Sequence, residues 1–119
     1  MTHPIQHFEV SANDRAAAAA FFTQVFGFTT QDFPEMNYTM VTTGEGSPTI
    51  GLNPVSENNP AGQVIPYFTS ESVKATLEKV SAAGGTVVME STPIPTVGDV
   101  GMFMDPTGNL LGVWRQDNQ

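Results

Sequence analysis

The fold is decided by the stretch Gly101-Met-Phe-Met-Asp-Pro-Thr-Gly-Asn-Leu-Leu-Gly-Val-Trp114. Within it, Asp105, Pro106 and Gly108 occupy the first, second and fourth positions of a type I turn, where these residue types are favoured. Apolar residues run on both sides of the turn. The stretch therefore predicts a β-hairpin with strands at 100–104 and 110–115.

Outward from this hairpin, one order of elements occurs twice along the chain. Alternating or apolar runs predict eight strands, at 5–10, 28–33, 38–42, 49–53, 64–69, 86–91, 100–104 and 110–115. A helix follows the first strand of each half, and a loop rich in Pro, Asn and Gly separates the halves. Helices inserted singly between strands predict an α+β fold in place of a doubly wound parallel sheet.

Each predicted helix has its own start and stop signals. The first begins at a cap on Asn13 or Asp14 and ends at Gly27. Its apolar stripe is made of Phe21, Phe22, Val25 and Phe26. The second helix begins at a cap on Ser70 or Ser72, places Val73, Leu77 and Val80 on one face, and ends at Gly84-Gly85.

Composition excludes several classes of partner. The chain has 119 residues, no cysteine and a net charge of −8. A disulfide framework and a thiolate metal site are therefore impossible, and an acidic surface disfavours nucleic acid and anionic membranes. We expect a cytoplasmic protein, since no signal segment is present. Charged residues make up only 13% of the chain, which together with many Phe and Met residues favours a homodimer.

The two halves resemble the vicinal-oxygen-chelate superfamily, which includes glyoxalase I, bleomycin-resistance proteins and extradiol dioxygenases. The residues that carry this resemblance are His7-Phe-Glu-Val10, Ala18-Ala-Ala-Phe-Phe22, Val25-Phe-Gly-Phe28, Ala82-Ala-Gly-Gly85 and Asp105-Pro-Thr-Gly-Asn109. The ending Gly-Asn-Leu-Leu-Gly-Val-Trp looks most like small glyoxalase-like bacterial proteins. The resemblance implies one domain over 1–119, commonly dimeric. Its two βαβββ modules (about 1–54 and 64–119, linker 55–63) would curl their sheets around one cavity.

The resemblance also implies where a metal ion would bind. Metal-dependent members take four ligands from four strands, which here fall at His7, near Gly51, at or near Tyr67, and at Gly112. Glycine has no side-chain ligand and a tyrosine phenol is a poor one at neutral pH. We therefore predict no metal and no cofactor. We also expect position 112 to face a cavity and to accept a glutamate.

Three interpretations of His7 stay open. It is an inert, hydrogen-bonded residue of the cavity wall, an acid–base group, or a metal ligand; its ordinary pKa near ~6.5 suits proton transfer. Glu9 shares the strand face of His7, so Glu9 and Tyr67 are the next candidates for catalysis, against a solvated or salt-bridged Glu9.

A small organic ligand is the function that these residues favour. We expect His7, Tyr38, Tyr67, Met102 and Trp114 to bind it, since aromatic groups with a polar end and methionine suit such cavities. Core packing is the competing role for the same side chains. The acidic chain favours a neutral or cationic ligand. The alternatives are a glyoxalase-related lyase, isomerase or dioxygenase-type enzyme acting through His7, metal-free or with an atypical metal site, and a purely structural role.

Overall fold

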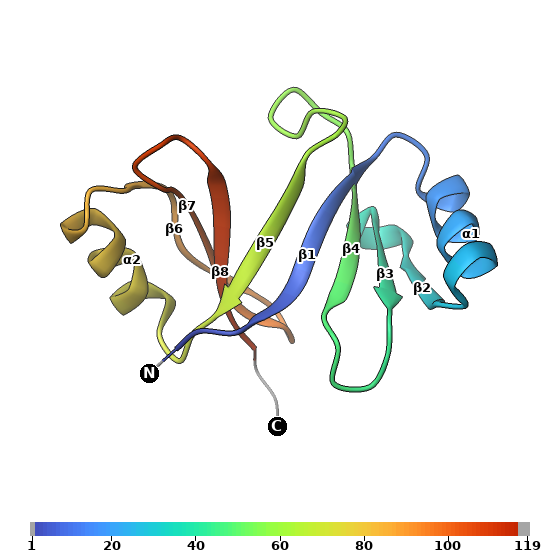
Figure 1. Cartoon of the computed structure of the whole chain (residues 1–119), viewed down its shortest axis with the longest axis horizontal. Coiled ribbons are helices and arrows are strands. Elements are labelled where there is room, and N and C mark those ends of the chain that lie inside the picture. Colours follow the sequence, from blue (N-terminus) through green and yellow to red (C-terminus); the bar gives the residue numbers. More distant parts are fainter. Residues whose placement is uncertain (1, 117–119) are drawn as a thin grey trace. The chain divides into compact units, whose positions relative to one another are not determined.

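The computed structural model describes residues 2–116 and is an α+β fold with two βαβββ modules (Figure 1). The first module contains β1 (Ile5–Ala12), α1 (Arg15–Phe26), β2 (Thr29–Phe33), the 3₁₀ turn η1 (Pro34–Met36), β3 (Tyr38–Thr42) and β4 (Thr49–Pro54). The second contains β5 (Val64–Thr69), α2 (Val73–Ala82), β6 (Thr86–Ile94), β7 (Gly98–Met104) and β8 (Leu110–Gln116). The predicted order of elements is confirmed.

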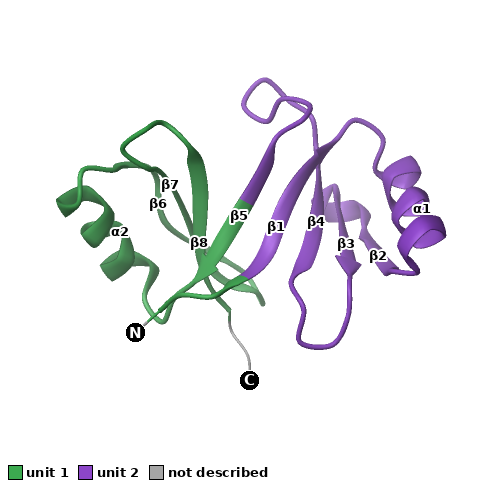
Figure 2. Ribbon diagram, in the orientation of Figure 1, with its two compact units in different colours: residues 1–5, 66–119 green, residues 6–65 purple. Residues whose placement is uncertain are grey.

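The chain separates into two compact units, coloured differently in Figure 2. We call Gln6–Ile65, purple in Figure 2, the first unit, and the rest of the described chain, green in Figure 2 and including residues 2–5, the second unit. The strand order is β2-β3-β4-β1 in the first unit and β5-β8-β7-β6 in the second. β1 pairs with β4 in parallel, and so does β5 with β8, whereas the other pairs within the units are antiparallel. The predicted single domain with its module boundaries stays a prediction.

The core of the first unit lies between its sheet and α1. Ala12, Val41 and Leu52 are buried there, and Phe22 of α1 packs against them. Successive strand residues point to opposite faces of a sheet. Because the face with Val41 and Leu52 carries the core, the other face of β1, β3 and β4 carries no helix of this unit. The predicted candidates of this unit lie on that helix-free face.

Side-chain and glycine caps fix the ends of α1. The carboxylate of Asp14 accepts a hydrogen bond from the Ala17 backbone N–H at 3.0 Å, so the cap is Asp14 and not Asn13. Gly27 closes the helix at φ 73° and donates its backbone N–H to the Thr23 carbonyl. Glycine adopts this left-handed conformation without steric cost. Both predicted signals therefore act as expected.

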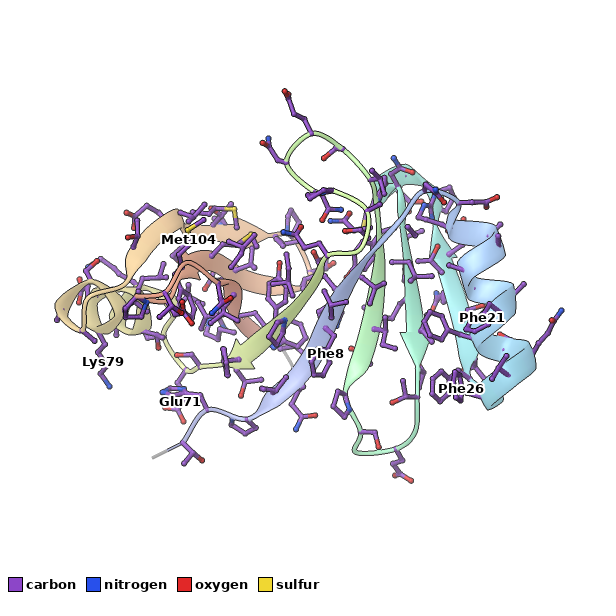
Figure 3. The ribbon with its side chains drawn as sticks, turned by 45° about the horizontal axis from the view of Figure 1, so that its top comes forward. Phe8, Phe21, Phe26, Glu71, Lys79 and Met104 are labelled. Carbon is purple, nitrogen blue, oxygen red and sulfur yellow. The ribbon has the colours of Figure 1, made fainter. Side chains whose placement is uncertain are left out.

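The apolar stripe of α1 is only partly buried. Phe21 is 56% exposed, Val25 55% and Phe26 58%, and Figure 3 shows Phe21 and Phe26 on this helix. The four apolar positions span about 140° of the helix surface, more than the ~100° that a surface helix usually turns to its core. Only the Phe22 side therefore reaches the core, and Phe26 stacks on Phe28 at 5.4 Å between ring centroids.

The second unit repeats this construction with a different helix. Ser72 is the cap of α2, accepting from the Ala75 backbone N–H at 3.1 Å. Val73 and Leu77 are buried against Val113 of β8. Gly101 allows this close approach, because a Cβ there would lie 2.9 Å from both Leu77 Cδ1 and Val73 Cγ1.

The turn of the closing hairpin forms as predicted. The Gly108 backbone N–H donates to the Asp105 carbonyl at 3.0 Å. The Asp105 carboxylate accepts from the Asn109 side chain and from the backbone N–H groups of Thr107 and Asn109. Hydrogen bonds from Asn109 and then Thr107 lower the pKa of Asp105 to about 2. Across residues 2–116, no helix is long and apolar enough to cross a membrane.

The same substitution at two valines of the first unit tests this core. Val41→Ala is expected to lower the free energy of unfolding by about 2 kcal/mol, because Val41 has no exposed surface and the deletion leaves a cavity. Val25→Ala, on the exposed side of α1, is expected to change it by less than about 0.5 kcal/mol. Chemical denaturation measures both. Equal losses would contradict the assignment of the α1 face.

Candidate functional site

The helix-free face of the first unit gathers polar side chains from three strands. His7 and Glu9 lie on β1, Tyr38 lies on β3, and Thr49 and Asn53 lie on β4. The parallel register pairs His7 with Thr49 and Glu9 with Gly51. Side chains of paired residues lie on the same face, so the register itself brings this set together.

Four hydrogen bonds join these side chains into one chain. His7 Nδ1 lies 2.7 Å from Thr49 Oγ1, and His7 Nε2 lies 2.9 Å from the Tyr38 hydroxyl oxygen. The Tyr38 hydroxyl donates to Glu9 Oε2 at 3.2 Å. Asn53 Nδ2 donates to Glu9 Oε1 at 3.3 Å. Tyr38 therefore connects His7 to Glu9, the two residues that the alternation predicts on one strand face.

For a neutral imidazole, one arrangement of hydrogens satisfies all four of these bonds. A tyrosine hydroxyl has a single hydrogen. Because Tyr38 gives that hydrogen to Glu9, His7 Nε2–H must be the donor to the Tyr38 oxygen. His7 Nδ1 then accepts the hydrogen of the Thr49 hydroxyl. Every donor in this series of hydrogen bonds therefore points toward the carboxylate of Glu9.

Burial keeps the imidazole of His7 neutral. His7 is only 5% exposed, and this desolvation lowers its pKa from 6.5 to about 4. Removing a charged group from water disfavours its charged form. At neutral pH the ring therefore has one N–H donor and one acceptor nitrogen, as the hydrogen-bond chain requires.

The Tyr38 hydroxyl occupies the space beside Gly51 that a side chain would otherwise fill. A Cβ on Gly51 would overlap the Tyr38 hydroxyl and would lie 2.9 Å from His7 Nε2. Real Cβ atoms essentially never approach other atoms within 3.0 Å. The tyrosine hydroxyl thus occupies the position next to His7 from which any side chain of residue 51 would begin.

The second unit repeats this relation between a glycine and a tyrosine. Tyr67 pairs with Gly112 in register, and a Cβ on Gly112 would lie 2.5 Å from two ring carbons of Tyr67. Tyr67 is 6% exposed, so its ring has little freedom to move aside. Our expectation that position 112 faces open space and accepts a glutamate is wrong, because the Tyr67 ring fills that space.

Met102 and Trp114 lie on the same face of the second sheet as Tyr67. Register pairs Met102 with Gly112 and Trp114 with Thr69. Val113, which alternates with these residues, is buried against α2. The predicted ligand-binding residues therefore lie on the helix-free faces, with His7 and Tyr38 in the first unit and Tyr67, Met102 and Trp114 in the second.

Sequence reasoning missed Thr49 and Asn53. Their only signal is parity: both lie on β4 at positions that alternate with the buried Leu52. Which of them meets His7 depends on the register of a parallel pair, which no local pattern reveals. Within residues 2–116, no three His, Cys, Asp or Glu side chains lie close enough together to hold a metal ion.

The low pKa of His7 makes stability depend on pH. The unfolded chain binds a proton at His7 with a pKa of 6.5, but the folded chain does so only near 4. Stability is therefore highest above pH 6.5 and falls as the pH is lowered toward 4, by up to about 3 kcal/mol. Denaturation at several pH values measures this loss. In His7→Gln, which cannot titrate, the slope should flatten; an unchanged slope would contradict the neutral, buried imidazole.

Comparison with known proteins agrees with this architecture. The family model of the Glyoxalase/Bleomycin resistance protein/Dioxygenase superfamily matches residues 4–113. A Mycobacterium bovis protein named "Putative glyoxylase CFP32" is 29% identical in an alignment of 114 residues that covers 90% of this chain and 43% of that protein. The chain thus spans less than half the length of this curated relative.

Solved structures show the same fold. Hypothetical protein BH1468 from Bacillus halodurans C-125 aligns with a TM-score of 0.77 at 16% identity, covering 100% of this chain and 98% of that one. Methylmalonyl-CoA epimerase from Mycobacterium tuberculosis aligns with a TM-score of 0.74 at 13% identity, covering 96% and 88%. With most of its length matched by the family model, the chain belongs to the Glyoxalase/Bleomycin resistance protein/Dioxygenase superfamily.

Proposed function

We propose that this member of the superfamily binds a small organic molecule without a metal ion, at a site whose metal ligands have been lost. The observation that carries the proposal is the pairing of glycine with tyrosine in both units. Gly51 and Gly112 stand at or near two implied ligand positions, and the adjoining space is taken by Tyr38 and Tyr67.

The side chains present do not fit a divalent ion. A catalytic ion normally takes about three protein ligands. Of the implied positions, the two glycines supply no ligand atom, and the Nε2 nitrogen of His7 is bonded to the Tyr38 hydroxyl. In the neutral tautomer assigned above, Nε2 carries a hydrogen and has no lone pair for a metal. No step of the proposed function therefore uses an ion.

Ligand contact is supported by partial exposure of the candidates. Tyr38, Met102 and Trp114 are half-buried, whereas His7 and Tyr67 are buried. In the first unit a ligand would therefore meet Tyr38 directly, and His7 would act on it through Tyr38. In the second unit, Met102 and Trp114 are the accessible candidates. Tyrosine and tryptophan offer wide apolar surfaces with a polar group, and methionine adapts to varied apolar shapes.

Proton transfer catalysis is the second candidate. The hydrogen-bond chain favours it, because Thr49, His7 and Tyr38 direct their hydrogens toward the Glu9 carboxylate. Glu9 would accept a proton from a bound substrate, with its carboxylate held in place by the Tyr38 hydroxyl. A lyase or isomerase of this kind would lose turnover in His7→Gln, whereas a binding protein has no turnover to lose.

Two further expectations belong to this proposal. A homodimer stays a prediction, supported by the low charged fraction of 13% beside eight Phe and six Met residues. Light scattering decides it against the chain mass of 12.7 kDa. A cytoplasmic location likewise stays a prediction, which cell fractionation would test.

Fluorescence of Trp114, the only tryptophan, tests ligand binding. Neutral and cationic aromatic compounds are screened for a change in emission and a raised melting temperature. For a compound that binds the helix-free face of the first unit, Tyr38→Phe is expected to weaken the affinity, read from the melting temperature, up to about tenfold, the effect of one hydrogen bond. Val25→Ala, on the outer side of α1, is the matched control and should leave affinity unchanged. Failure of every compound to alter either signal would contradict the proposal.

A further inference from the structure

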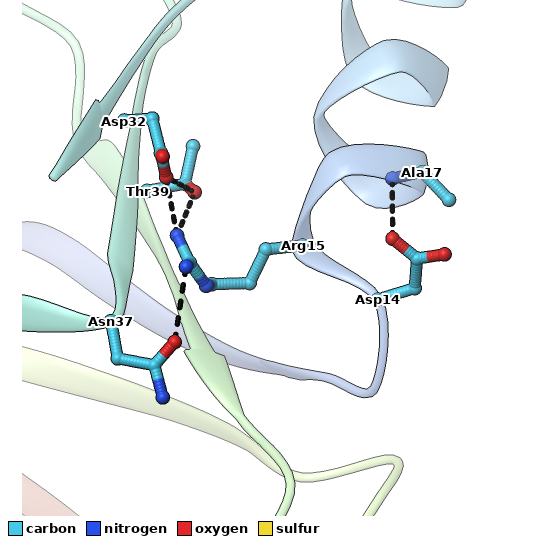
Figure 4. A network of polar contacts seen from close by, with 6 residues as sticks. All are labelled: Asp14, Arg15, Ala17, Asp32, Asn37 and Thr39. Carbon is cyan, nitrogen blue, oxygen red and sulfur yellow. Dashed lines mark hydrogen bonds and ion pairs between the residues drawn. The ribbon is translucent and has the colours of Figure 1, made fainter. Parts of the chain in front are cut away.

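The guanidinium of Arg15 binds the segment that leads into β3, the strand on which Tyr38 lies. Arg15 lies in the first turn of α1, and its Nη1 pairs with the Asp32 carboxylate and donates to Thr39 Oγ1 at 2.8 Å. Its Nη2 donates to Asn37 Oδ1 at 3.0 Å. Thr39 Oγ1 in turn donates to Asp32 Oδ1 at 2.8 Å. Figure 4 shows these contacts converging on the guanidinium.

The two residues that flank Tyr38 are both bound by this group. Asn37 immediately precedes Tyr38 and Thr39 immediately follows it. Thr39 is buried on the α1 side of β3, whereas the Tyr38 hydroxyl meets His7 and Glu9 on the helix-free face. Neighbouring strand residues point to opposite faces. Arg15 therefore restrains the backbone on both sides of Tyr38 from the face opposite its hydroxyl.

A gain in local stability does not explain the position of Arg15. A cation in the first turn of a helix is disfavoured by the helix dipole. The Asp32 carboxylate is 55% exposed, so its ion pair with Arg15 adds little stability. Asn37 has φ 54°, a left-handed conformation that asparagine adopts more readily than most residues. Its side-chain oxygen accepts a hydrogen bond from Arg15 Nη2.

We infer that Arg15 is a positioning residue for Tyr38, keeping its hydroxyl between His7 Nε2 and Glu9. The guanidinium does not touch the hydrogen-bond chain itself. It acts through Asn37 and Thr39, across the thickness of the sheet. The importance of this placement for ligand binding rests on the proposed function, but the placement is measurable in the ligand-free protein.

The test is NMR of the full chain labelled at tyrosine Cζ and at the histidine nitrogens. In Arg15→Met, which keeps an unbranched apolar stem but removes the guanidinium, the Tyr38 Cζ resonance should shift. The His7 Nε2 proton should exchange with water about tenfold faster or more, because its acceptor is less often in place. Tyr67, in the other unit, is the internal reference and should not change.

Three variants separate positioning from general stability. Lys74→Met removes the exposed Lys74–Glu78 pair of α2 and should leave both signals unchanged. Phe22→Leu destabilises the core of the same unit and should lower the melting temperature without moving the Tyr38 resonance. Asn37→Gly accepts the positive φ but removes the amide acceptor, and should move Tyr38 as Arg15→Met does.

The inference is overturned if folded Arg15→Met keeps the parental Tyr38 and His7 signals, or if Phe22→Leu shifts them equally. Should Arg15→Met fail to fold, Asn37→Gly decides alone: a Tyr38 shift supports positioning and an unchanged resonance refutes it. No ligand is added in these measurements. A failed ligand screen therefore contradicts the proposed function but not the positioning role of Arg15. Unchanged NMR signals contradict the positioning role but not the proposed function.

Discussion

The Tyr38 hydroxyl lies where the side chain of residue 51 would begin, and the polar face of the first unit depends on that contact. Gly51 makes room for the phenol beside His7. With the phenol there, the His7 Nε2 hydrogen has an acceptor and Glu9 has a donor. Any larger residue at position 51 would displace the hydroxyl and leave buried polar atoms without partners, which costs more than the bonds contribute.

Burial and hydrogen bonding act together on His7. A buried, charged imidazole would be costly, and the low pKa of about 4 keeps the ring neutral. A neutral imidazole accepts one hydrogen bond and donates another, so it links the Thr49 hydroxyl to the Tyr38 hydroxyl. In this arrangement His7 orients the Tyr38 hydroxyl, and the half-buried phenol is the group that our proposal places against a ligand.

Features that depend only on neighbouring residues could be predicted from the sequence. The turn at Asp105–Gly108, the cap at Asp14 and the stop at Gly27 depend on local backbone chemistry, and each formed as predicted. The predicted alternation also placed His7 and Glu9 correctly on one face. These signals need no knowledge of what lies across the sheet.

Features set by distant residues were not predictable. Tyr38 and Gly51 are far from His7 in the chain, and their meeting depends on the registers of β3 and β1 with β4. The same limit explains position 112, where only the register with Tyr67 shows that the space is filled. The apolar stripe also led us to expect more burial of α1 than the structure shows. A stripe in the sequence shows which positions are apolar, but not how much of the helix the sheet covers.

We propose that Tyr38 takes the place of a metal ligand beside His7. Nitrogen-15 NMR of labelled histidine during addition of one equivalent of Zn²⁺ tests it most directly. The account predicts that the Nδ1 and Nε2 resonances of His7 stay at their metal-free positions, with Nε2 protonated. A Zn²⁺-dependent change at His7 Nε2 that saturates at one ion per chain would contradict it.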